Sequence, residues 1–525
     1  MSPRVADAFA LLPEYLGWHV LLSASALALG LLISLPLAVA ASRSPRLRWP
    51  VLALAGLIQT IPSLALLALF YPLLLALSAL SLATFGQGFS ALGFLPSLLA
   101  LTLYSMLPIL RTATAGILGV DPAVREAADG VGMTARQRLL QVELPLAMPV
   151  IMAGVRTAAV WTIGAATLST PVGQTSLGNY IFAGLQTENW VFVLFGCAAS
   201  AGLALVADQL LGLIETGAAR RKRGLIVAGA ALLAVGVAAA LLPLASFGRP
   251  ASYVVGAKNF SEQYILAELM AERLESAGGQ VTRKEDLGSA VAYRALAAGE
   301  LDVYVDYSGT LWTNVLKRED NPGRAAVLAE LTTELKRRDG VVVLGSLGFE
   351  NAYAFAMRAD RARALGVTSL ADLAREAPRL TLGSDLEFLS RPEWKGVDAA
   401  YGFNFKAERS FQPTFMYRAL SGGEADVISA FSSDGRIAAD RLVVLTDPKG
   451  ALPPYDAVIL ISPRRAGDTR LIEALRPLVG KISVEAMRAA NYSVDRDSGK
   501  ATPAEAARAL EQQASSLPEL GEPRP

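Results

Sequence analysis

Histidine and cysteine are almost absent from this chain of 525 residues, which contains one of each, His19 and Cys197. A single cysteine cannot form a disulfide within the chain, and one residue of each type argues against a transition-metal site. A single histidine also excludes catalytic arrangements built on a second one. The phosphate-binding pattern Gly-x4-Gly-Lys-Ser/Thr is absent too, so we do not expect ATP hydrolysis on this chain. We therefore expect no catalytic residues, no metal and no cofactor.

Charge is scarce and balanced. The chain has 48 basic and 47 acidic residues, a net charge of +1, and only 18% charged residues. This balance gives no reason to expect nucleic acid as a partner. The hydrophobic fraction of 53% indicates a membrane protein instead, and the length allows three or more domains.

Six apolar runs are each long enough to cross a bilayer core, which requires about 20 helical residues. The runs are 20–41, 51–75, 92–116, 148–168, 190–214 and 225–245. The first is too long, and lacks the small-residue cleavage site, for a removable signal peptide. His19 opens this run, and we expect it at the membrane interface. The sequence thus predicts an all-α polytopic membrane domain at 1–217, with a sixth helix and linker at 218–251.

The orientation of these spans follows from basic residues in the short loops. These residues are Arg43, Arg46 and Arg48; Arg125, Arg136 and Arg138; and Arg220 to Arg223. All three groups fall on one side of the membrane if the N-terminus is outside. We therefore expect these loops in the cytoplasm, and everything after the sixth span outside, in a bacterial inner membrane.

Several runs contain polar or helix-breaking residues: Gln59, Pro62 and Ser63; Pro108 and Arg111; Thr170 and Pro171. In lipid, such groups must face protein or a water-filled path. Two interpretations stay open. The residues line a translocation route, or they kink the helices, with Arg111 at the cytoplasmic boundary.

A polar segment between the third and fourth runs, the elbow (residues 126–145), has a distinct pattern. It reads Glu126-Ala127-Ala128, three residues, Gly132, nine residues, then Val142-x-Leu144-Pro145. Asp121 before Pro122 predicts the start of one short helix. Thr134 with Gln137 predicts a capping box for a second helix, which Pro145 is expected to end.

The elbow resembles the coupling loop of ABC-importer permeases, E-A-A, three residues, G, nine residues, I-x-L-P, with Val142 in place of isoleucine. The resemblance implies that a separate cytoplasmic ATPase, which holds the ATP, docks on the elbow, and that the chain forms a homodimer. The alternative is a chance helix-turn-helix loop. The stretch from Gln59 to Leu67 also looks like osmoprotectant-importer permeases.

From about residue 252 the sequence alternates short β-runs with amphipathic helices, which predicts α/β units. One segment is repeated: Tyr293–Val303 recurs as Tyr417–Val427, and each copy leads into an aromatic-serine pair. These pairs are Tyr307-Ser308 and Phe431-Ser432. Ligands bind at the carboxyl ends of strands in open α/β sheets. The repeat therefore predicts a two-lobed clamshell with one aromatic residue from each lobe, although both aromatics as core packing is the alternative.

We place this domain at 252–525, with the first lobe at 252–355 and 452–525 and the second at 356–451. Four segments resemble the glycine betaine/carnitine/choline binding proteins of ABC importers. They are Asn259-Phe-Ser-Glu-Gln263, Leu287-Gly-Ser289, Asp306-Tyr-Ser-Gly-Thr310 and Ser433-Asp-Gly-Arg-Ile437. Together with the membrane half, they suggest an osmoprotectant-type permease fused to its own receptor.

The ligand class implied by this resemblance is a small cationic or zwitterionic solute. A quaternary ammonium group donates no hydrogen bonds, so aromatic faces bind it, each contributing about 0.5–2 kcal/mol. The aromatic candidates are Tyr307, Phe431, Tyr353 and Tyr417, of which Tyr417 has the weakest support because its repeat partner Tyr293 has no assigned role.

A ligand carboxylate requires donors, and the candidates are Gln263, Asn351, Thr310 and Arg391. Gln263 lies near a helix N-terminus, which favours an anion. Arg391 is either ligand-facing or exposed, because Pro392-Glu393-Trp394 departs from the Asp-Gly turn of the family. Glu350 and Asp306 are acidic alternatives that would face the cation.

Three function classes remain. The first is a subunit of an ATP-driven importer for glycine betaine, choline, carnitine or a similar solute, with a related fused family that takes up ergothioneine as an alternative. The second is a membrane-tethered sensor, which would not need the elbow. The third is an extracytoplasmic enzyme, which no nucleophile-base arrangement supports.

Overall fold

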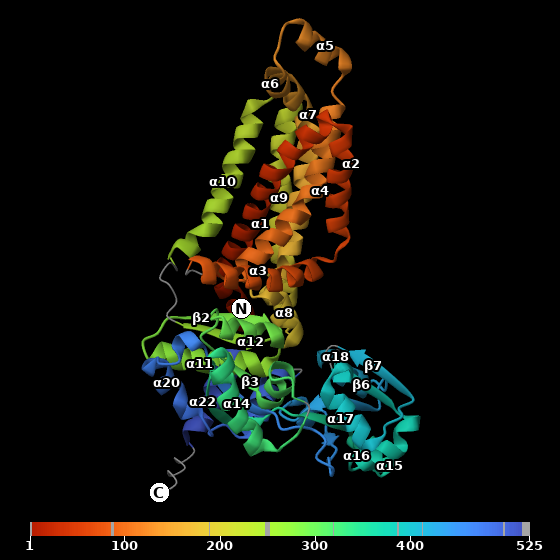
Figure 1. The fold of residues 1–525 in the computed structure, drawn as a ribbon, viewed down its shortest axis with the longest axis vertical. Helices are drawn as coiled ribbons and strands as arrows, with labels where there is room; N and C mark the ends of the chain where they lie inside the picture. The colour runs from red at the N-terminus through yellow and green to blue at the C-terminus, as the bar shows by residue number, and fades with distance from the viewer. Residues whose placement is uncertain are drawn as a thin grey trace. The chain divides into compact units, whose positions relative to one another are not determined.

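The computed structural model describes residues 3–85, 89–187, 189–246, 253–318, 320–385, 388–411, 413–496 and 499–516. The chain divides into two compact units, a helical one made of 1–182 with 191–249, and an α/β one made of 183–190 with 250–525 (Figure 1). The predicted boundary at 251/252 lies outside the described residues. Each unit is described by itself.

The helical unit begins with α1 (Pro3–Arg43), α2 (Pro45–Thr60), α3 (Ser63–Phe85), α4 (Phe94–Leu118), α5 (Pro122–Gly130) and α6 (Ala135–Arg138). It continues through the π-helical turn η1 (Leu139–Glu143), α7 (Leu144–Ala166), the 3-10 turn η2 (Thr167–Val172), α8 (Gly178–Gln186), α9 (Trp190–Ala219) and α10 (Arg223–Ser246).

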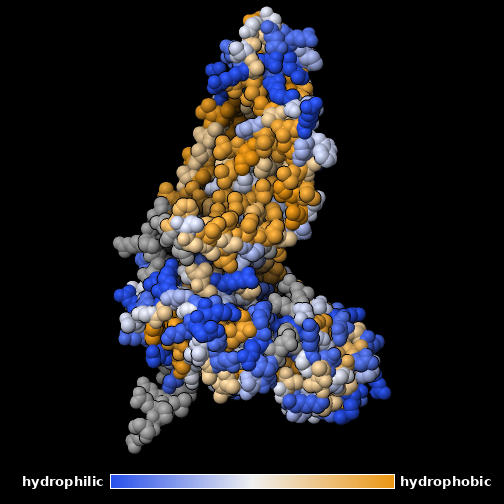
Figure 2. Space-filling model, in the orientation of Figure 1, coloured by the Kyte–Doolittle hydropathy of each residue, from blue (hydrophilic) through white to orange (hydrophobic). Residues whose placement is uncertain are grey.

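Six helical segments in the described part of the chain are long and apolar enough to cross a membrane. They are Val5–Arg43, Ser63–Phe85, Phe94–Leu118, Ala135–Val172, Trp190–Ala219 and Arg223–Leu244. Figure 2 shows apolar side chains over the sides of this helical unit, and polar side chains at the end formed by α5 and α6. The predicted number of spans is therefore confirmed.

The second predicted span, 51–75, is wrong in its bounds. Ile61 has an extended backbone (φ −73°, ψ 127°), and the helix stops there before Pro62. A proline disfavours helical geometry in the residue before it and supplies no N–H of its own. The exposed carbonyl of Ile61 instead accepts a hydrogen bond from the hydroxyl of Tyr104. The run is thus split into α2, which is 16 residues long, and the spanning helix α3.

Helices α1, α4 and α7 pack closely at the centre of the helical unit. A Cβ atom on Gly30 of α1 would lie 1.9 Å from Ser105 Oγ of α4. A Cβ atom on Gly154 of α7 would lie 1.8 Å from Thr112 Oγ1, also of α4. Small residues at such crossings let helix backbones approach in membranes. The buried side chains around them include Leu107, Leu110, Ile151 and Val155.

His19 packs inside the helical unit. It is fully buried, its Nε2 is 3.0 Å from the carbonyl oxygen of Ile163, and its Nδ1 accepts from the backbone N–H of Leu177 at 3.3 Å. A ring that accepts at one nitrogen and donates at the other is neutral. The partners of His19 come from α7 and from the segment before α8, and its position at the membrane interface stays a prediction.

The α/β unit contains two five-stranded sheets. The first has the order β2 (Val281–Leu287), β1 (Tyr253–Lys258), β3 (Val303–Tyr307), β10 (Asp456–Ile461), β4 (Val342–Glu350). The second has the order β7 (Ala407–Phe411), β6 (Thr381–Asp385), β8 (Val427–Phe431), β5 (Tyr353–Arg358), β9 (Leu442–Val444). Each sheet is mixed, because β10 and β5 run antiparallel to both of their neighbours.

The helices of the first lobe are α11 (Ser261–Ser276), α12 (Ser289–Ala297), α13 (Ser308–Thr310), α14 (Arg324–Asp339), α20 (Thr469–Leu475), α21 (Val484–Asp495) and α22 (Pro503–Ser516). Those of the second are α15 (Ala359–Leu365), α16 (Leu370–Glu376), α17 (Pro392–Tyr401), α18 (Pro413–Ser421) and α19 (Arg436–Ala439). Short turns complete both lobes: η3 (Leu311–Val315), η4 (Ala377–Arg379), η5 (Phe388–Ser390), η6 (Pro463–Arg465) and η7 (Arg476–Leu478).

The two copies of the repeat form equivalent helix-strand units in the two lobes, as predicted. Helix α12 leads into β3 at the centre of the first sheet, and α18 leads into β8 at the centre of the second. The chain crosses between the lobes after β4 and returns before β10, and these two crossings touch where the N–H of Asn351 donates to the carbonyl of Tyr455 at 2.9 Å. The lobe boundary predicted at 355/356 is a few residues late, because β5 already pairs with β8 from Tyr353 onward.

Candidate functional site

The two predicted aromatic residues lie at equivalent positions of the two lobes. Tyr307 is the last residue of β3, and Phe431 is the last residue of β8. Phe431 lies directly opposite Tyr353 in the antiparallel pair of β8 and β5. Cross-strand neighbours on one sheet face are close enough for their rings to pack. The second lobe therefore presents two aromatic residues at one point of its sheet.

Tyr353 is the centre of an aromatic cluster. Its ring centroid lies 4.7 Å from that of Phe388, 5.0 Å from that of Phe431 and 5.8 Å from that of Tyr455. Phe388 and Tyr455 were not predicted as site residues. Phe388 belongs to the 3-10 turn η5 after β6, and Tyr455 to the returning crossing just before β10. Their approach depends on tertiary structure that sequence spacing does not reveal.

Arg391 lies inside this cluster rather than at the surface. Its guanidinium carbon is 5.5 Å from the ring centroid of Tyr353, and only 8% of the residue is exposed. Its Nε and Nη2 donate to Glu393 at 3.3 and 3.2 Å. Of the two alternatives for Arg391, the structure favours the one in which it faces the cluster.

Glu393 joins the two lobes at the same place. One of its oxygens accepts from the hydroxyl of Thr313 in the first lobe at 3.3 Å, and also from the hydroxyl of Tyr455. Glu393 is 3% exposed. A buried carboxylate is costly unless it is paired and hydrogen-bonded, and here Arg391, Thr313 and Tyr455 supply those partners.

Tyr307 belongs to a second, polar group of buried side chains. Its hydroxyl donates to Glu262 Oε1 at 2.6 Å and accepts from Gln263 Nε2 at 2.9 Å. Glu262 also accepts from Asn351 Nδ2 at 3.1 Å and from Asn491 Nδ2 at 2.9 Å. Burial raises the pKa of Glu262, while these donors oppose that rise. Gln263 and Asn351, both predicted to bind a ligand carboxylate, donate to protein groups in this structure.

The acidic alternatives have cationic partners of their own. Asp306 forms a buried ion pair with Lys258, whose Nζ lies 5.1 Å from the ring centroid of Tyr307. Glu350 pairs with Arg324. Neither carboxylate is therefore needed to explain how the site would hold a cation.

The remaining two predicted residues differ in their surroundings. Thr310 is 7% exposed and ends α13, which follows Tyr307 directly. Tyr417 packs instead in the core of the second lobe with Met416, Leu420 and Ile428, and the guanidinium carbon of Arg436 lies 4.2 Å from its ring centroid. Among the described ring contacts, none joins Tyr417 to the Tyr353 cluster, which favours the packing alternative.

Asp286 carries a pH-dependent prediction for the α/β unit. Asp286 is the second-last residue of β2 and is only 2% exposed, and the hydroxyl of Tyr264 donates to one of its carboxyl oxygens. Burial raises its pKa to about 7, against an ordinary value of about 3.9. The carboxyl group of the folded state therefore binds its proton more tightly than that of the unfolded chain.

The stability from this proton is complete below about pH 4 and is lost as the pH rises through about 7. Asp286→Asn mimics the protonated group and should flatten this dependence. At pH 8 it should make the unit more stable than the parent by on the order of 3 kcal/mol. Urea unfolding of residues 251–525 at pH 5 and pH 8 measures this. If the free energy of unfolding changes equally between pH 5 and pH 8 in the parent and in Asp286→Asn, the prediction is contradicted.

The elbow has both of the predicted caps. Asp121 accepts from the N–H of Ala123 at 2.9 Å, and Thr134 and Gln137 form the reciprocal capping box. Gly132 has φ +78°, a left-handed conformation that favours glycine. Of the predicted docking residues, Glu126, Ala127, Gly132 and Pro145 are exposed, Leu144 is half-buried and Ala128 is buried.

Pro145 does not end the second elbow helix. The chain passes from α6 through the π-helical turn η1 directly into α7, and Pro145 occupies the second position of α7. A proline crowds the α-helical turn before it, and here that turn is the wider π-helical η1 instead of an α-helical one. The predicted end of the helix is thus the beginning of a spanning one.

One group of charged residues in the membrane helices was not predicted. Arg156 of α7 donates from Nε and Nη2 to Asp208 of α9 at 2.9 and 2.7 Å, and from Nη1 to Glu215 at 2.7 Å. Charged residues inside a span usually pair in this way. Their presence in two apolar runs was a usable signal in the sequence.

Comparisons with known proteins agree with this division of the chain. A family described as "Binding-protein-dependent transport system inner membrane component" matches residues 30–220. A second, "Substrate binding domain of ABC-type glycine betaine transport system", matches residues 251–512.

Individual proteins are also similar. The chain is 38% identical over 199 residues to the glycine betaine/carnitine/choline transport system permease protein OpuCB of Bacillus subtilis, which covers 38% of this chain and 84% of that protein. It is 29% identical over 464 residues to the ergothioneine transport permease/ergothioneine binding protein EgtU of Helicobacter pylori, which covers 85% of this chain and 80% of that one. The crystal structure of a glycine betaine/carnitine/choline ABC transporter has a TM-score of 0.45 and 28% identity, and it covers 50% of this chain and 99% of that one.

The helical unit with its elbow, the two-lobed α/β unit, the two family matches and the similarity to the Bacillus subtilis permease lead to one assignment. The chain belongs to the ABC-importer permeases of the glycine betaine, carnitine and choline type, carries the substrate-binding domain of such a system on the same polypeptide, and is a transporter subunit rather than an enzyme.

Proposed function

We propose that this chain imports a small trimethylammonium zwitterion, which its α/β unit binds beside the Tyr353 cluster. The observation that carries the proposal is the position of Arg391, a buried guanidinium group beside the ring of Tyr353, around which three further aromatic rings pack. Aromatic faces attract an ammonium group that cannot donate hydrogen bonds, and a guanidinium group binds a carboxylate through two parallel hydrogen bonds. The site thus offers a partner to each end of a zwitterion.

In this proposal the ligand carboxylate takes the place of Glu393 on Arg391. The ligand ammonium group lies against Tyr353 and Phe431, and Tyr307 of the first lobe closes on it. Gln263 holds Tyr307 directly and Asn351 holds it through Glu262, while Thr310 lies in α13, which follows Tyr307 in the chain. Because the two halves of the site come from different lobes, ligand binding favours the closed clamshell.

Glycine betaine, choline and carnitine all fit the ammonium part of this description, and ergothioneine is the alternative. The Helicobacter pylori protein, named for ergothioneine, is similar to both halves of this chain, which supports that alternative. Calorimetric titration of residues 251–525 with these four solutes separates the possibilities. We expect one or more to bind, and glycine betaine or carnitine more tightly than choline if Arg391 binds a carboxylate. Failure of all four to bind the folded unit would refute the proposed ligand class.

Energy for import comes from a separate ATPase. No cofactor is expected on this chain, and ATP is held by that partner, which docks on the elbow. The importer contains two copies of the chain, as a homodimer, in a bacterial inner membrane. The exposed position of Glu126, Ala127 and Gly132 supports the docking site.

The orientation of the multi-pass chain gives a direct prediction. The basic residues 220–223 between α9 and α10 should be cytoplasmic, and residues 250–525 should lie outside the membrane. Protease added to intact spheroplasts should therefore remove the α/β unit and leave the 216–224 loop uncut until the cells are lysed. Protection of the α/β unit in intact spheroplasts would overturn the orientation.

A further inference from the structure

Glu143 is a buried carboxylate at the junction of the elbow and the membrane helices. It ends the π-helical turn η1, directly before α7, and it is 0% exposed. In the coupling-loop pattern it fills the unspecified position between Val142 and Leu144, so the motif itself assigns it no role. A carboxylate buried so completely needs cationic partners.

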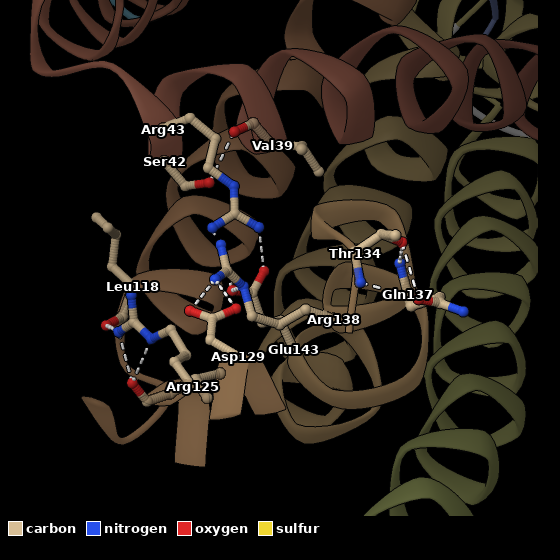
Figure 3. Close-up of polar contacts among 11 residues, drawn as sticks. Val39, Ser42, Arg43, Leu118, Arg125, Asp129, Thr134, Gln137, Arg138 and Glu143 are labelled. Atoms are coloured by element: carbon tan, nitrogen blue, oxygen red, sulfur yellow. Dashed lines mark hydrogen bonds and ion pairs between the residues drawn. The ribbon is translucent and has the colours of Figure 1, made fainter. Parts of the chain in front are cut away.

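Two arginines from different parts of the helical unit supply them (Figure 3). Arg43, the last residue of α1, donates from Nη1 to Glu143 Oε1 at 3.1 Å and from Nη2 to Oε2. Arg138, the last residue of α6, has its Nε 3.3 Å from Glu143 Oε1. The same carboxylate therefore binds the end of a membrane helix and the second helix of the elbow.

The chain of charges continues into the first elbow helix. Arg138 donates from Nη1 to both carboxylate oxygens of Asp129, which lies in the last turn of α5 (Figure 3). Four side chains in contact therefore form a series of alternating negative and positive charges. The series joins both elbow helices to α1, and its members in order are Asp129, Arg138, Glu143 and Arg43. A bidentate arginine-carboxylate pair adds geometric specificity as well as energy, and Arg43 makes such a pair with Glu143.

Helix α1 is well placed to carry a displacement into the rest of the unit. It packs against α4, where Gly30 meets Ser105 without room for a Cβ atom. It also contributes Ala38 to the buried cluster that contains residues of α4 and α7. Packed helices with little free volume move as bodies rather than deform. A displacement of Arg43 is therefore expected to move α1 as a whole.

We propose that Glu143 is a positioning residue that transmits movement of the docked ATPase from the elbow to α1. The inference rests on the proposed function, because it assumes that an ATPase docks on the elbow. Docking requires only the exposed surface of α5 and α6. Transmission of movement requires that this surface also be connected to α1. Glu143 makes that connection through its ion pairs with Arg43 and Arg138.

The test uses the full chain with its ATPase, reconstituted in liposomes, and measures the amount of glycine betaine, choline, carnitine or ergothioneine transported per ATP hydrolysed. Glu143→Gln keeps the shape of the side chain and removes its charge. Arg43→Gln removes the partner on α1. Arg46→Gln is the matched control, because it removes the same charge three residues further along and the described contacts include none for Arg46.

We expect Glu143→Gln and Arg43→Gln to lower transport per ATP at least tenfold, while the ATPase still co-purifies and still hydrolyses ATP. The double variant should be no worse than either single one, because both remove the same connection. Arg46→Gln should behave as the parent.

Two results would overturn the inference. One is a transport ratio like that of the parent in Glu143→Gln. The other is parallel loss of ATPase co-purification and thermal stability, which would make the role of Glu143 merely structural. A parent chain that binds its ATPase but transports no ligand would instead refute the proposed function, and the inference with it.

Discussion

ATP-driven uptake should be abolished when Glu126 is replaced by lysine, while ligand binding by the α/β unit stays as in the parent. Glu126 is exposed on α5, in the patch that also contains Ala127. A reversed charge there opposes whatever complementary charge the ATPase presents, and like charges in an interface cost several kcal/mol, of the order of several decades in affinity. Glu126 belongs to the helical unit, whereas the proposed ligand site lies in the α/β unit.

Gly132→Pro tests the shape of the same surface. Gly132 has φ +78° and its N–H donates to the carbonyl of Asp129 at 3.0 Å. Proline fixes φ near −65° and has no N–H, so it can adopt neither feature. The control is Gly130→Ala, because a Cβ atom on Gly130 meets nothing within 4 Å and φ there is helical. Uptake at the parent rate in both Glu126→Lys and Gly132→Pro would contradict the docking assignment.

Tyr307→Leu should raise the dissociation constant for a trimethylammonium ligand about tenfold or more. A desolvated cation–π contact contributes roughly 1–2 kcal/mol, and 1.4 kcal/mol corresponds to one decade. Leucine has similar bulk but no π face. It also removes the hydroxyl group that donates to Glu262, so the change must be separated from a loss of stability.

Tyr307→Phe supplies that separation. It keeps the ring and loses only the hydroxyl group, so it should destabilise the α/β unit by about 1–3 kcal/mol but weaken binding little. Phe431→Ala should weaken binding as strongly as Tyr307→Leu, and Phe431→Tyr should be mild because the π face survives. If Tyr307→Leu is folded and binds as tightly as the parent, the aromatic site does not include Tyr307.

The fold of both units was predictable because its signals are local or repeated. Six apolar runs predict six spans, and two copies of one helix-strand segment predict two lobes with equivalent central strands, β3 and β8. The bounds of the second span could not be predicted, because an apolar run suggests one continuous helix even where Pro62 breaks it. Pro145 misled in the opposite sense, since the helical path continues through it from η1 into α7.

The site was predictable only in part, because its residues meet through strand register and lobe contacts. Tyr353 and Phe431 are opposite each other only because β5 pairs antiparallel with β8 at that register. Arg391 directly precedes α17, and its environment depends on Tyr353 of strand β5, which lies far from it in the sequence. Glu143 has a partner 100 residues earlier in the chain, and no local pattern indicates such a distance. Sequence spacing identifies residue types for a role, whereas burial decides which of them perform it.

The measurement that tests the account most directly is ligand accumulation by the full chain reconstituted with its ATPase in liposomes. The α/β unit faces the medium, and ATP is supplied on the elbow side. The account predicts that a trimethylammonium zwitterion which binds residues 251–525 accumulates inside only when ATP is hydrolysed, and that the chain without the ATPase transports none. Accumulation without the ATPase, or none by an intact complex that binds both the ligand and ATP, would contradict it.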